Sequence, residues 1–141
     1  MIEKATDKDI NQIMTIWLDI NIKTHYYINS NYWYDNFDYV KAAINNSDIY
    51  LYKVKNEIVG FIGLTNNYIA GIFIKEDYQK KGIGQLLINH VKNNNSTLEL
   101  TVYQKNKQAI SFYFNNDFLI KDKSLDEINK EIEYTMIWNK Q

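Results

Sequence analysis

The spacing of apolar residues changes several times along the chain between a helical period and a strand-like one, and this alternation limits the folds open to it. Helices are predicted from Thr6 or Asp7 through Ile20, in a second segment that ends at Ile44, after Gly84, and over 109–114. Strands are predicted over 2–5, 49–54, 58–64, 68–74, 98–103, 118–120 and 132–138. The order β-α-α-β-β-β-α-β-α-β-β indicates a mixed α/β architecture built in layers.

The length of the chain favours a single domain over residues 1–141, and its lack of cysteine excludes several kinds of site. A chain of 141 residues, 45% of them hydrophobic, can bury a full core without a disulfide or a structural metal. Cysteine is absent, which excludes a disulfide framework, a thiolate zinc site and a cysteine nucleophile. The two histidines, His25 and His90, are far apart in the sequence, so no metal site is expected.

The charge balance argues against nucleic acid as a partner, because sixteen basic residues are matched by seventeen acidic ones and the net charge is -1. No apolar stretch is long enough to span a membrane, and the N-terminus lacks the pattern of a secretion signal, so a cytoplasmic protein is expected. Every basic residue is a lysine. A phosphate group therefore has to be bound by lysines, backbone amides or a helix N-terminus rather than by an arginine fork.

Residues 79–84, with the sequence QKKGIG, lie between a predicted strand and a predicted helix, where phosphate groups bind readily. The helix N-terminus offers unpaired amides, the glycines allow close approach, and the two lysines add positive charge. The alternative is an ordinary loop with solvated lysines, and this pattern alone does not decide between the two. A dinucleotide-binding loop is excluded because Leu87 occupies the position of its third glycine, and a P-loop because no Gly-Lys-Ser or Gly-Lys-Thr occurs.

Two blocks of residues, taken together, resemble those of the GNAT-type N-acetyltransferases. The first is the apolar triplet 72–74 followed by 79–84, which is similar to the family's motif Q/R-x-x-G-x-G/A after its fourth strand. The second is the strand over 98–103 followed by Asn106 and Tyr113, which are seven residues apart. Two motifs in this order are far more specific than either alone, and the likeness extends over nearly the whole chain.

The N-terminal part narrows the resemblance, because Trp17 and His25 with their neighbours resemble the small YjaB-like bacterial acetyltransferases. Two positions depart from the family pattern. Glu76 stands where a proline is usual, and Asp117 stands where a glycine precedes Phe118. Aspartate tolerates the left-handed conformation expected at such a helix end, so the fold expectation is little affected.

The resemblance implies a mostly antiparallel sheet of six to seven strands flanked by about four helices. It also implies transfer of acetyl from acetyl-CoA, without a metal, to a primary amine of a small molecule or peptide by direct attack. The expected oligomeric state is a monomer or a homodimer. The residues implied to bind the cofactor are Ile72, Phe73, Ile74, Gln79, Lys80, Lys81, Gly82, Ile83, Gly84, Gln85, Asn106 and Tyr113.

The same resemblance assigns Tyr113 as the general acid that protonates the departing thiolate. A phenol has a reference pKa of about 10, comparable to that of a thiol, so the proton transfer is chemically reasonable. The alternative is that Tyr113 is one of twelve tyrosines that simply pack. For the base that takes the amine proton, the candidates are Glu99, His25 and Glu57, of which Glu99 is selected as catalytic.

The segment from Thr24 to Tyr39 is the most aromatic part of the chain. Aromatic rings attract ammonium groups, so this segment suits an amine acceptor, although such rings equally suit a core or a dimer contact. The residues predicted to bind the acceptor are His25, Tyr26, Trp33 and Tyr68. The alternative function is a non-catalytic acyl-CoA-binding or interaction module on the same fold, since a fold alone does not establish activity.

Overall fold

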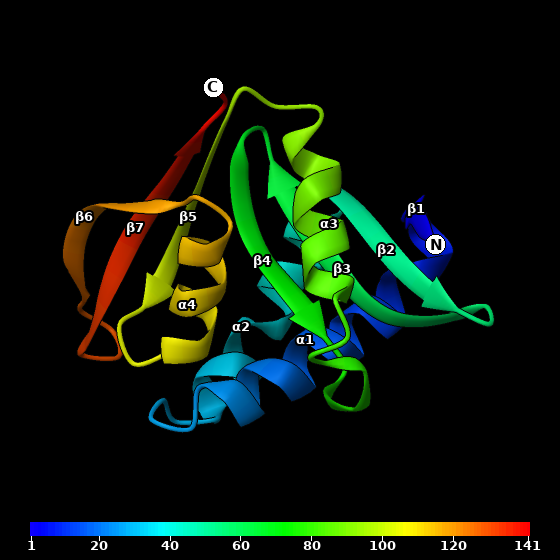
Figure 1. Ribbon diagram of the computed structural model, residues 1–141. Helices are drawn as coiled ribbons and strands as arrows, with labels where there is room; N and C mark the ends of the chain where they lie inside the picture. The colour runs from blue at the N-terminus through cyan, green and yellow to red at the C-terminus, as the bar shows by residue number, and fades with distance from the viewer.

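The computed structural model describes all residues from Met1 to Gln141 and contains one sheet of seven strands in the order β1-β2-β3-β4-β5-β7-β6 (Figure 1). Every neighbouring pair is antiparallel except β4 and β5. The strands are β1 (Ile2–Lys4), β2 (Asp48–Val54), β3 (Glu57–Thr65), β4 (Tyr68–Ile74), β5 (Thr97–Tyr103), β6 (Leu119–Asp126) and β7 (Glu131–Asn139). The helices are α1 (Ile10–Thr24), α2 (Asn31–Ile44), α3 (Ile83–Lys92) and α4 (Lys107–Asn115), with short 3-10 turns at Asp7–Asp9 and Glu76–Tyr78. The predicted sheet type, strand number and helix number are confirmed.

The sheet has a hydrophobic core on each face. Helices α3 and α4 cover one face, where Leu87, Ile88 and Val91 pack against Leu98, Leu100 and Met136. Helices α1 and α2 cover the other face with a core that includes Ile13, Met14, Trp17, Trp33 and Phe61. Strand β3 is buried on both sides because it lies under helices on both faces, which explains its unbroken apolar sequence. None of the helices combines the length and the apolar composition needed to cross a membrane.

Helix α1 begins later than the sequence indicated. Thr6 precedes a 3-10 turn, and the carboxylate of Asp9 accepts a hydrogen bond of 2.9 Å from the Thr6 backbone amide. The α-helix itself starts at Ile10, with Asp9 as its N-cap residue. The sequence does not distinguish this short 3-10 turn from the first turn of an α-helix, so the observed start of α1 lies a few residues later than predicted.

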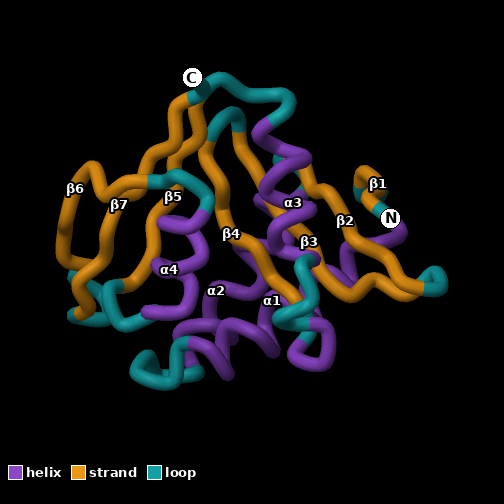
Figure 2. Tube along the Cα trace, viewed as in Figure 1, coloured by secondary structure: helices purple, strands orange, loops and turns teal.

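Strand β4 contains an extra residue, Ala70, relative to its partner strand β3. The pairing runs Leu64 with Ile69 and then Gly63 with Gly71, so Ala70 has no partner on β3 and the strand bulges there. The parallel pairing of β4 with β5 ends at the same place, at Ile69 with Leu100. Beyond it the two strands diverge, as both the ribbon and the tube show (Figures 1 and 2). The sheet is therefore open between the C-terminal parts of β4 and β5.

Strand β6 runs much further than the predicted 118–120. It continues to Asp126, and nearly all of its residues are exposed. As the edge strand it pairs only with β7, and its backbone hydrogen bonds need no apolar side chains. The polar run from Lys121 to Asp126 therefore shows no strand-like alternation in the sequence.

Helix α4 ends in a Schellman motif that fixes Tyr113. The amide of Phe118 donates to the carbonyl of Tyr113 at 3.0 Å, and the amide of Asp117 donates to that of Phe114 at 3.1 Å. The rings of Tyr113 and Phe118 are in contact, with centroids 5.6 Å apart. Asp117 has a φ of 69°, which confirms the expected left-handed position.

We expect the variant Asp117→Gly to be more stable than Asp117→Ala by about 1–2 kcal/mol, because alanine has a steric penalty in the left-handed region that glycine lacks. Urea unfolding of both variants measures the difference. Equal stabilities would show that the chain leaves the left-handed conformation at little cost.

Candidate active site

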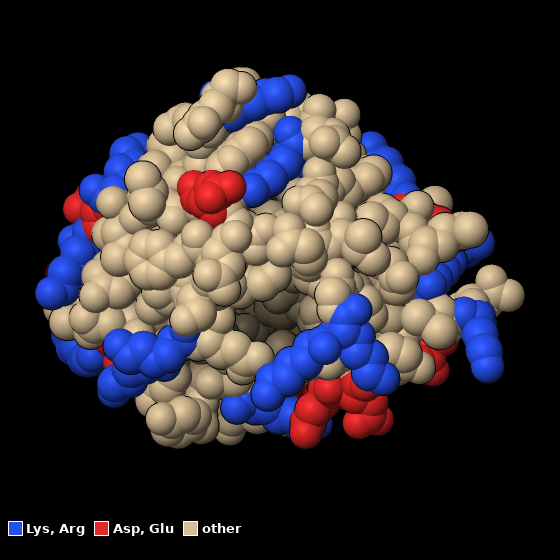
Figure 3. Space-filling view, in the orientation of Figure 1, with Lys and Arg blue, Asp and Glu red and all other residues tan.

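A cavity of about 440 Å³ lies where the sheet is open. Figure 3 shows it as a hollow near the centre of the face that carries α3 and α4, with lysine side chains along one side. Its wall is formed by α1, the end of β4, the loop into α3 and the first turns of α4. The lining residues are Ile20, Thr24, Ile72, Ile74, Tyr78, Gln79, Lys80, Gly82, Ile83, Gly84, Gln85, Asn106, Gln108, Ala109, Phe112 and Tyr113.

Of the residues predicted to bind the cofactor, all except Phe73 and Lys81 line this cavity. Phe73 faces the other side of the sheet, where its ring stacks on Phe61 at 5.0 Å, because successive strand side chains alternate. Lys81 is exposed and lies over the ring of Tyr78 at 5.6 Å. The cavity thus brings together two motifs that are far apart in the sequence.

The loop into α3 presents free backbone amides to the cavity. No amide from Lys80 to Gln85 is a donor in the loop and cap hydrogen bonds, and the first amides of a helix have no partner within it. Gly82 precedes the helix with a φ of 84°, a conformation that suits glycine. At Gly84 a Cβ atom would lie 3.4 Å from the Phe112 ring, an ordinary van der Waals contact, so α3 and α4 pack closely here. This end of the cavity can bind an anionic group.

The edge of β4 that faces the opening also offers main-chain groups. The amide of Lys75 donates to the carbonyl of Val59 at 2.8 Å, which fixes the alternation of the β3–β4 ladder. Phe73 therefore turns its N–H and C=O toward β3, whereas Ile72 and Ile74 turn theirs toward the opening. The Gln79 side chain donates to the Ile74 carbonyl at 2.9 Å and holds the start of the loop against β4.

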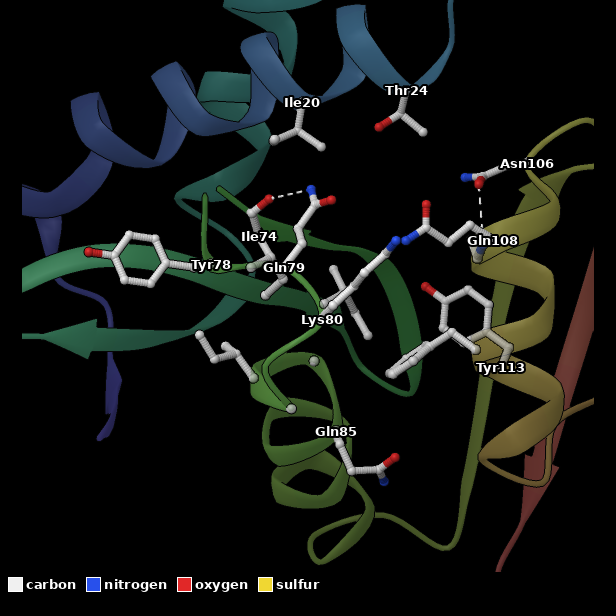
Figure 4. A pocket seen from close by; sticks show the side chains of 16 residues that line it. Ile20, Thr24, Ile74, Tyr78, Gln79, Lys80, Gln85, Asn106, Gln108 and Tyr113 are labelled. Carbon is white, nitrogen blue, oxygen red and sulfur yellow. Dashed lines mark hydrogen bonds between the residues drawn. The ribbon is translucent and has the colours of Figure 1, made fainter. Parts of the chain in front are cut away.

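The Tyr113 hydroxyl points into the cavity from α4 (Figure 4). The residue is only 7% exposed, and burial raises the pKa of its phenol well above the ordinary value, with a smaller contribution from Tyr68. The phenol is therefore protonated at physiological pH and is a hydrogen-bond donor. Asn106, seven residues earlier, is the N-cap of α4 and accepts a hydrogen bond of 3.2 Å from the Ala109 amide. Asn106 thus fixes the start of the helix that positions Tyr113.

Several lining residues were not predicted. Ile20 and Thr24 are four residues apart and come from one face of α1, and Gln108 and Phe112 have the same spacing on α4. The spacing of Gln108, Ala109, Phe112 and Tyr113 is the signal that could have identified the α4 face. For α1, no sequence signal indicates which part of the helix reaches the opening.

Glu99 does not line the cavity. It lies on β5 opposite Tyr68, and its carboxylate pairs with the Lys121 ammonium at 3.2 Å. Glu57, at the start of β3, is 4.0 Å from the Lys75 ammonium. The catalytic role of Glu99 therefore stays a prediction.

The four residues predicted to bind the acceptor lie outside the cavity lining. His25 stacks on Trp33 at 5.2 Å and contacts Tyr103 edge-on at 5.4 Å. Trp33 is buried in the core between α1 and α2, whereas Tyr26 is 83% exposed. Tyr68 is partly exposed at the start of β4. The structure thus brings His25 and Trp33 together and leaves Tyr26 and Tyr68 apart from them.

Burial lowers the pKa of His25 from 6.5 to about 4, opposed by the nearby backbone of Asn21. The unfolded chain therefore binds a proton between pH 6.5 and 4 that the folded chain excludes, so the stabilisation is complete above pH 6.5 and is lost as the pH falls toward 4. We expect the wild type to lose about 3 kcal/mol more than His25→Gln between pH 7 and 4. Urea unfolding across this range measures it, and parallel pH profiles would contradict it.

A family model described as an acetyltransferase (GNAT) domain matches residues 25–131. The chain therefore belongs to the GNAT family and is a GNAT-type N-acetyltransferase, as the two sequence motifs predicted.

The chain is similar along its whole length to named members of the family. It is 29% identical over 140 residues to the peptidyl-lysine N-acetyltransferase YiaC of Escherichia coli K12, covering 98% of this chain and 96% of that protein. The solution structure of apo YjaB from Escherichia coli superposes with a TM-score of 0.85 at 20% identity, covering 100% of this chain and 98% of that one. The PaiA N-acetyltransferase of Thermoplasma acidophilum, solved with coenzyme A, gives 0.78 at 18% identity, covering 99% of both chains. The predicted YjaB-like character is confirmed.

Proposed function

We propose that the chain transfers an acetyl group from acetyl-CoA to the side-chain amine of a lysine in a peptide or protein. The observation that carries this proposal is the protonated Tyr113 hydroxyl, which points into a cavity that begins at the N-terminus of α3. The choice of a peptide lysine over other amines rests on the likeness to YiaC, which is named a peptidyl-lysine N-acetyltransferase.

The residues of the cavity fit acetyl-CoA. The free amides from Lys80 to Gln85 and the N-terminus of α3 suit its pyrophosphate, with Lys80 and Lys81 supplying positive charge in a chain that has no arginine. The main-chain groups of Ile72 and Ile74 suit its amide-containing arm. Acetyl-CoA supplies an acetyl group that is activated as a thioester.

Two groups of this chain stabilise the charges that develop during transfer. Tyr113 donates its phenolic proton to the departing sulfur, since its hydroxyl points into the cavity. The N–H groups of Ile72 and Ile74 face the opening and are available to the acetyl oxygen as it becomes negative, whereas that of Phe73 bonds to β3. A main-chain donor of this type contributes on the order of 3–4 kcal/mol elsewhere.

The acceptor amine must lose a proton before or during its attack, and we assign this step to Glu99. Its carboxylate is partly exposed and lies beside Tyr68, at the end of the opening where β4 and β5 still pair. The carboxylate accepts a hydrogen bond from the Lys121 ammonium, and proton transfer from the amine runs through water near this carboxylate.

The proposal is tested first by ligand binding. Thermal unfolding is measured with acetyl-CoA, CoA, NAD and ATP, each at the same ionic strength. A ligand at about 100 times its dissociation constant adds ~2.7 kcal/mol, which raises Tm by several degrees. We expect the two CoA compounds alone to do this. An equal shift with every nucleotide would show a general anion site.

The second test is transfer itself. A lysine-containing peptide and the same peptide with arginine in place of lysine are incubated with acetyl-CoA, and peptide mass and free thiol are followed together. One thiol released for each acetylated lysine supports the proposal. If the chain binds CoA but transfers acetyl to no amine, spermidine included, the proposal is wrong. The alternative, a non-catalytic acyl-CoA-binding module, would then stand, although the family match does not favour it.

A further inference from the structure

Lys80 has a place in the cavity that its neighbour Lys81 does not share. It lines the same cavity as Tyr113, and its side chain extends across that cavity toward Gln108 and the Tyr113 hydroxyl (Figure 4). Lys81 points away and lies over the Tyr78 ring. Lys80 therefore extends from the phosphate end of the cavity toward Tyr113, the proposed proton donor to the departing sulfur.

The backbone fixes this direction. Lys80 has a φ of 61°, in the left-handed region that a residue with a side chain avoids. The preceding residue, Gln79, is anchored to the Ile74 carbonyl, and Gly82, two residues after Lys80, is the N-cap of α3. The loop is thus held at both ends, and the side chain of Lys80 is directed inward by the turn between them.

The Lys80 ammonium is also free of a carboxylate partner. None of the ion pairs in the structure includes it, although Glu76 and Asp77 are close in sequence. Glu76 pairs instead with Lys23 at 3.3 Å. No ion pair has to break before this amine loses a proton and becomes a nucleophile.

We propose that Lys80 is a self-acetylation site, an inference that rests on the proposed function. The neutral Nζ attacks the carbonyl carbon of the thioester, an N–C bond forms and the C–S bond breaks. The sulfur leaves as a thiol after taking a proton from Tyr113, and the proton that Nζ loses passes through water to the Tyr113 oxygen and restores its hydroxyl. The products are an acetyl-lysine at position 80 and CoA.

Self-acetylation alters the binding of the donor. Residues 75–81 contain Lys75, Lys80 and Lys81 with Glu76 and Asp77, a formal charge of plus one that falls to zero when Lys80 is acetylated. The loop would then attract the phosphates of CoA less strongly. Loss of one charge near a phosphate corresponds to about a fivefold weaker affinity. The modification would therefore limit the enzyme when acetyl-CoA is abundant and acceptors are scarce.

The test incubates the purified full chain with acetyl-CoA and no acceptor, and maps acetylated peptides by mass spectrometry. We expect Lys80 to be acetylated at least about tenfold faster than Lys81, because only Lys80 lines the cavity together with Tyr113. The fractional rate should not change when the protein is diluted. In urea, the two lysines should react alike. In titrations with CoA, Lys80→Gln should bind about fivefold more weakly than Lys80→Arg, which keeps the charge.

Acetylation of the lysine peptide is measured in parallel, so that the two proposals fail separately. Peptide acetylation without preferential modification of Lys80 would overturn self-acetylation and leave the proposed function standing. A rate at Lys80 that depends on protein concentration would overturn the intramolecular step. If neither the peptide nor Lys80 is acetylated, both proposals are wrong.

Discussion

Replacing Tyr113 by phenylalanine is expected to lower turnover at saturating acetyl-CoA by about 10²–10⁴-fold, the usual contribution of a positioned general acid. The phenyl ring keeps the contacts with Phe112 and Phe118, so the fold and the cavity wall are retained. Only the hydroxyl that points into the cavity is lost. The departing sulfur must then take its proton from water, which is why the effect falls on turnover.

The measurement is the steady-state rate of thiol release with a lysine peptide, with thermal unfolding as a check that the variant is folded. Tyr50→Phe is a matched control. Tyr50 is a partly buried tyrosine on β2 whose ring packs beside His90 of α3, and it does not line the cavity. Unchanged turnover in Tyr113→Phe would show that the tyrosine only packs, the alternative that the sequence leaves open.

The second large effect is expected on stability. Phe118 is fully buried, and Phe118→Ala should destabilise the protein by about 3–5 kcal/mol, because it loses apolar burial and leaves a cavity. That is a large part of the stability of a typical domain. The deleted ring also supports the Tyr113 ring and lies under the Lys92 ammonium at 5.7 Å. The variant should therefore lose turnover even where it remains folded.

Urea unfolding gives the stability change, and turnover is measured at a temperature at which the variant is folded. Phe114→Ala is the matched control, because Phe114 lies in α4, four residues before Phe118, but is 44% exposed, and its removal should cost well under half as much. A stability loss for Phe118→Ala no greater than that of Phe114→Ala would contradict the role of the Schellman contact.

The strands near the site were predictable because their neighbours mark them clearly. Strand β4 is observed at the predicted residues, since a turn at Asn66, with a φ of 56°, precedes it and a polar loop follows it. Strand β5 alternates strictly between the buried Leu98, Leu100 and Val102 and partly exposed residues, which is the pattern of a strand with one covered face. Local sequence was sufficient in both cases.

What the sequence did not indicate depends on contacts between distant segments. The exposed edge of β6 has no apolar pattern because only backbone hydrogen bonds hold it to β7. Of the cavity residues on α1, Ile20 belongs to the same apolar stripe as the core residues, and Thr24 is a polar residue one turn later, so only the packing of α1 across the sheet identifies them. His25, predicted to bind the acceptor, stacks on Trp33, and its role in binding stays a prediction.

The extra residue at Ala70 also bears on how chains of this kind diverge over generations. The bulge, rather than any side chain in the cavity, ends the pairing of β4 with β5. Loss of a single codon there would restore a regular ladder with β3 and let the strand continue beside β5. Every residue that lines the cavity would still be encoded, yet the entrance for a donor would close.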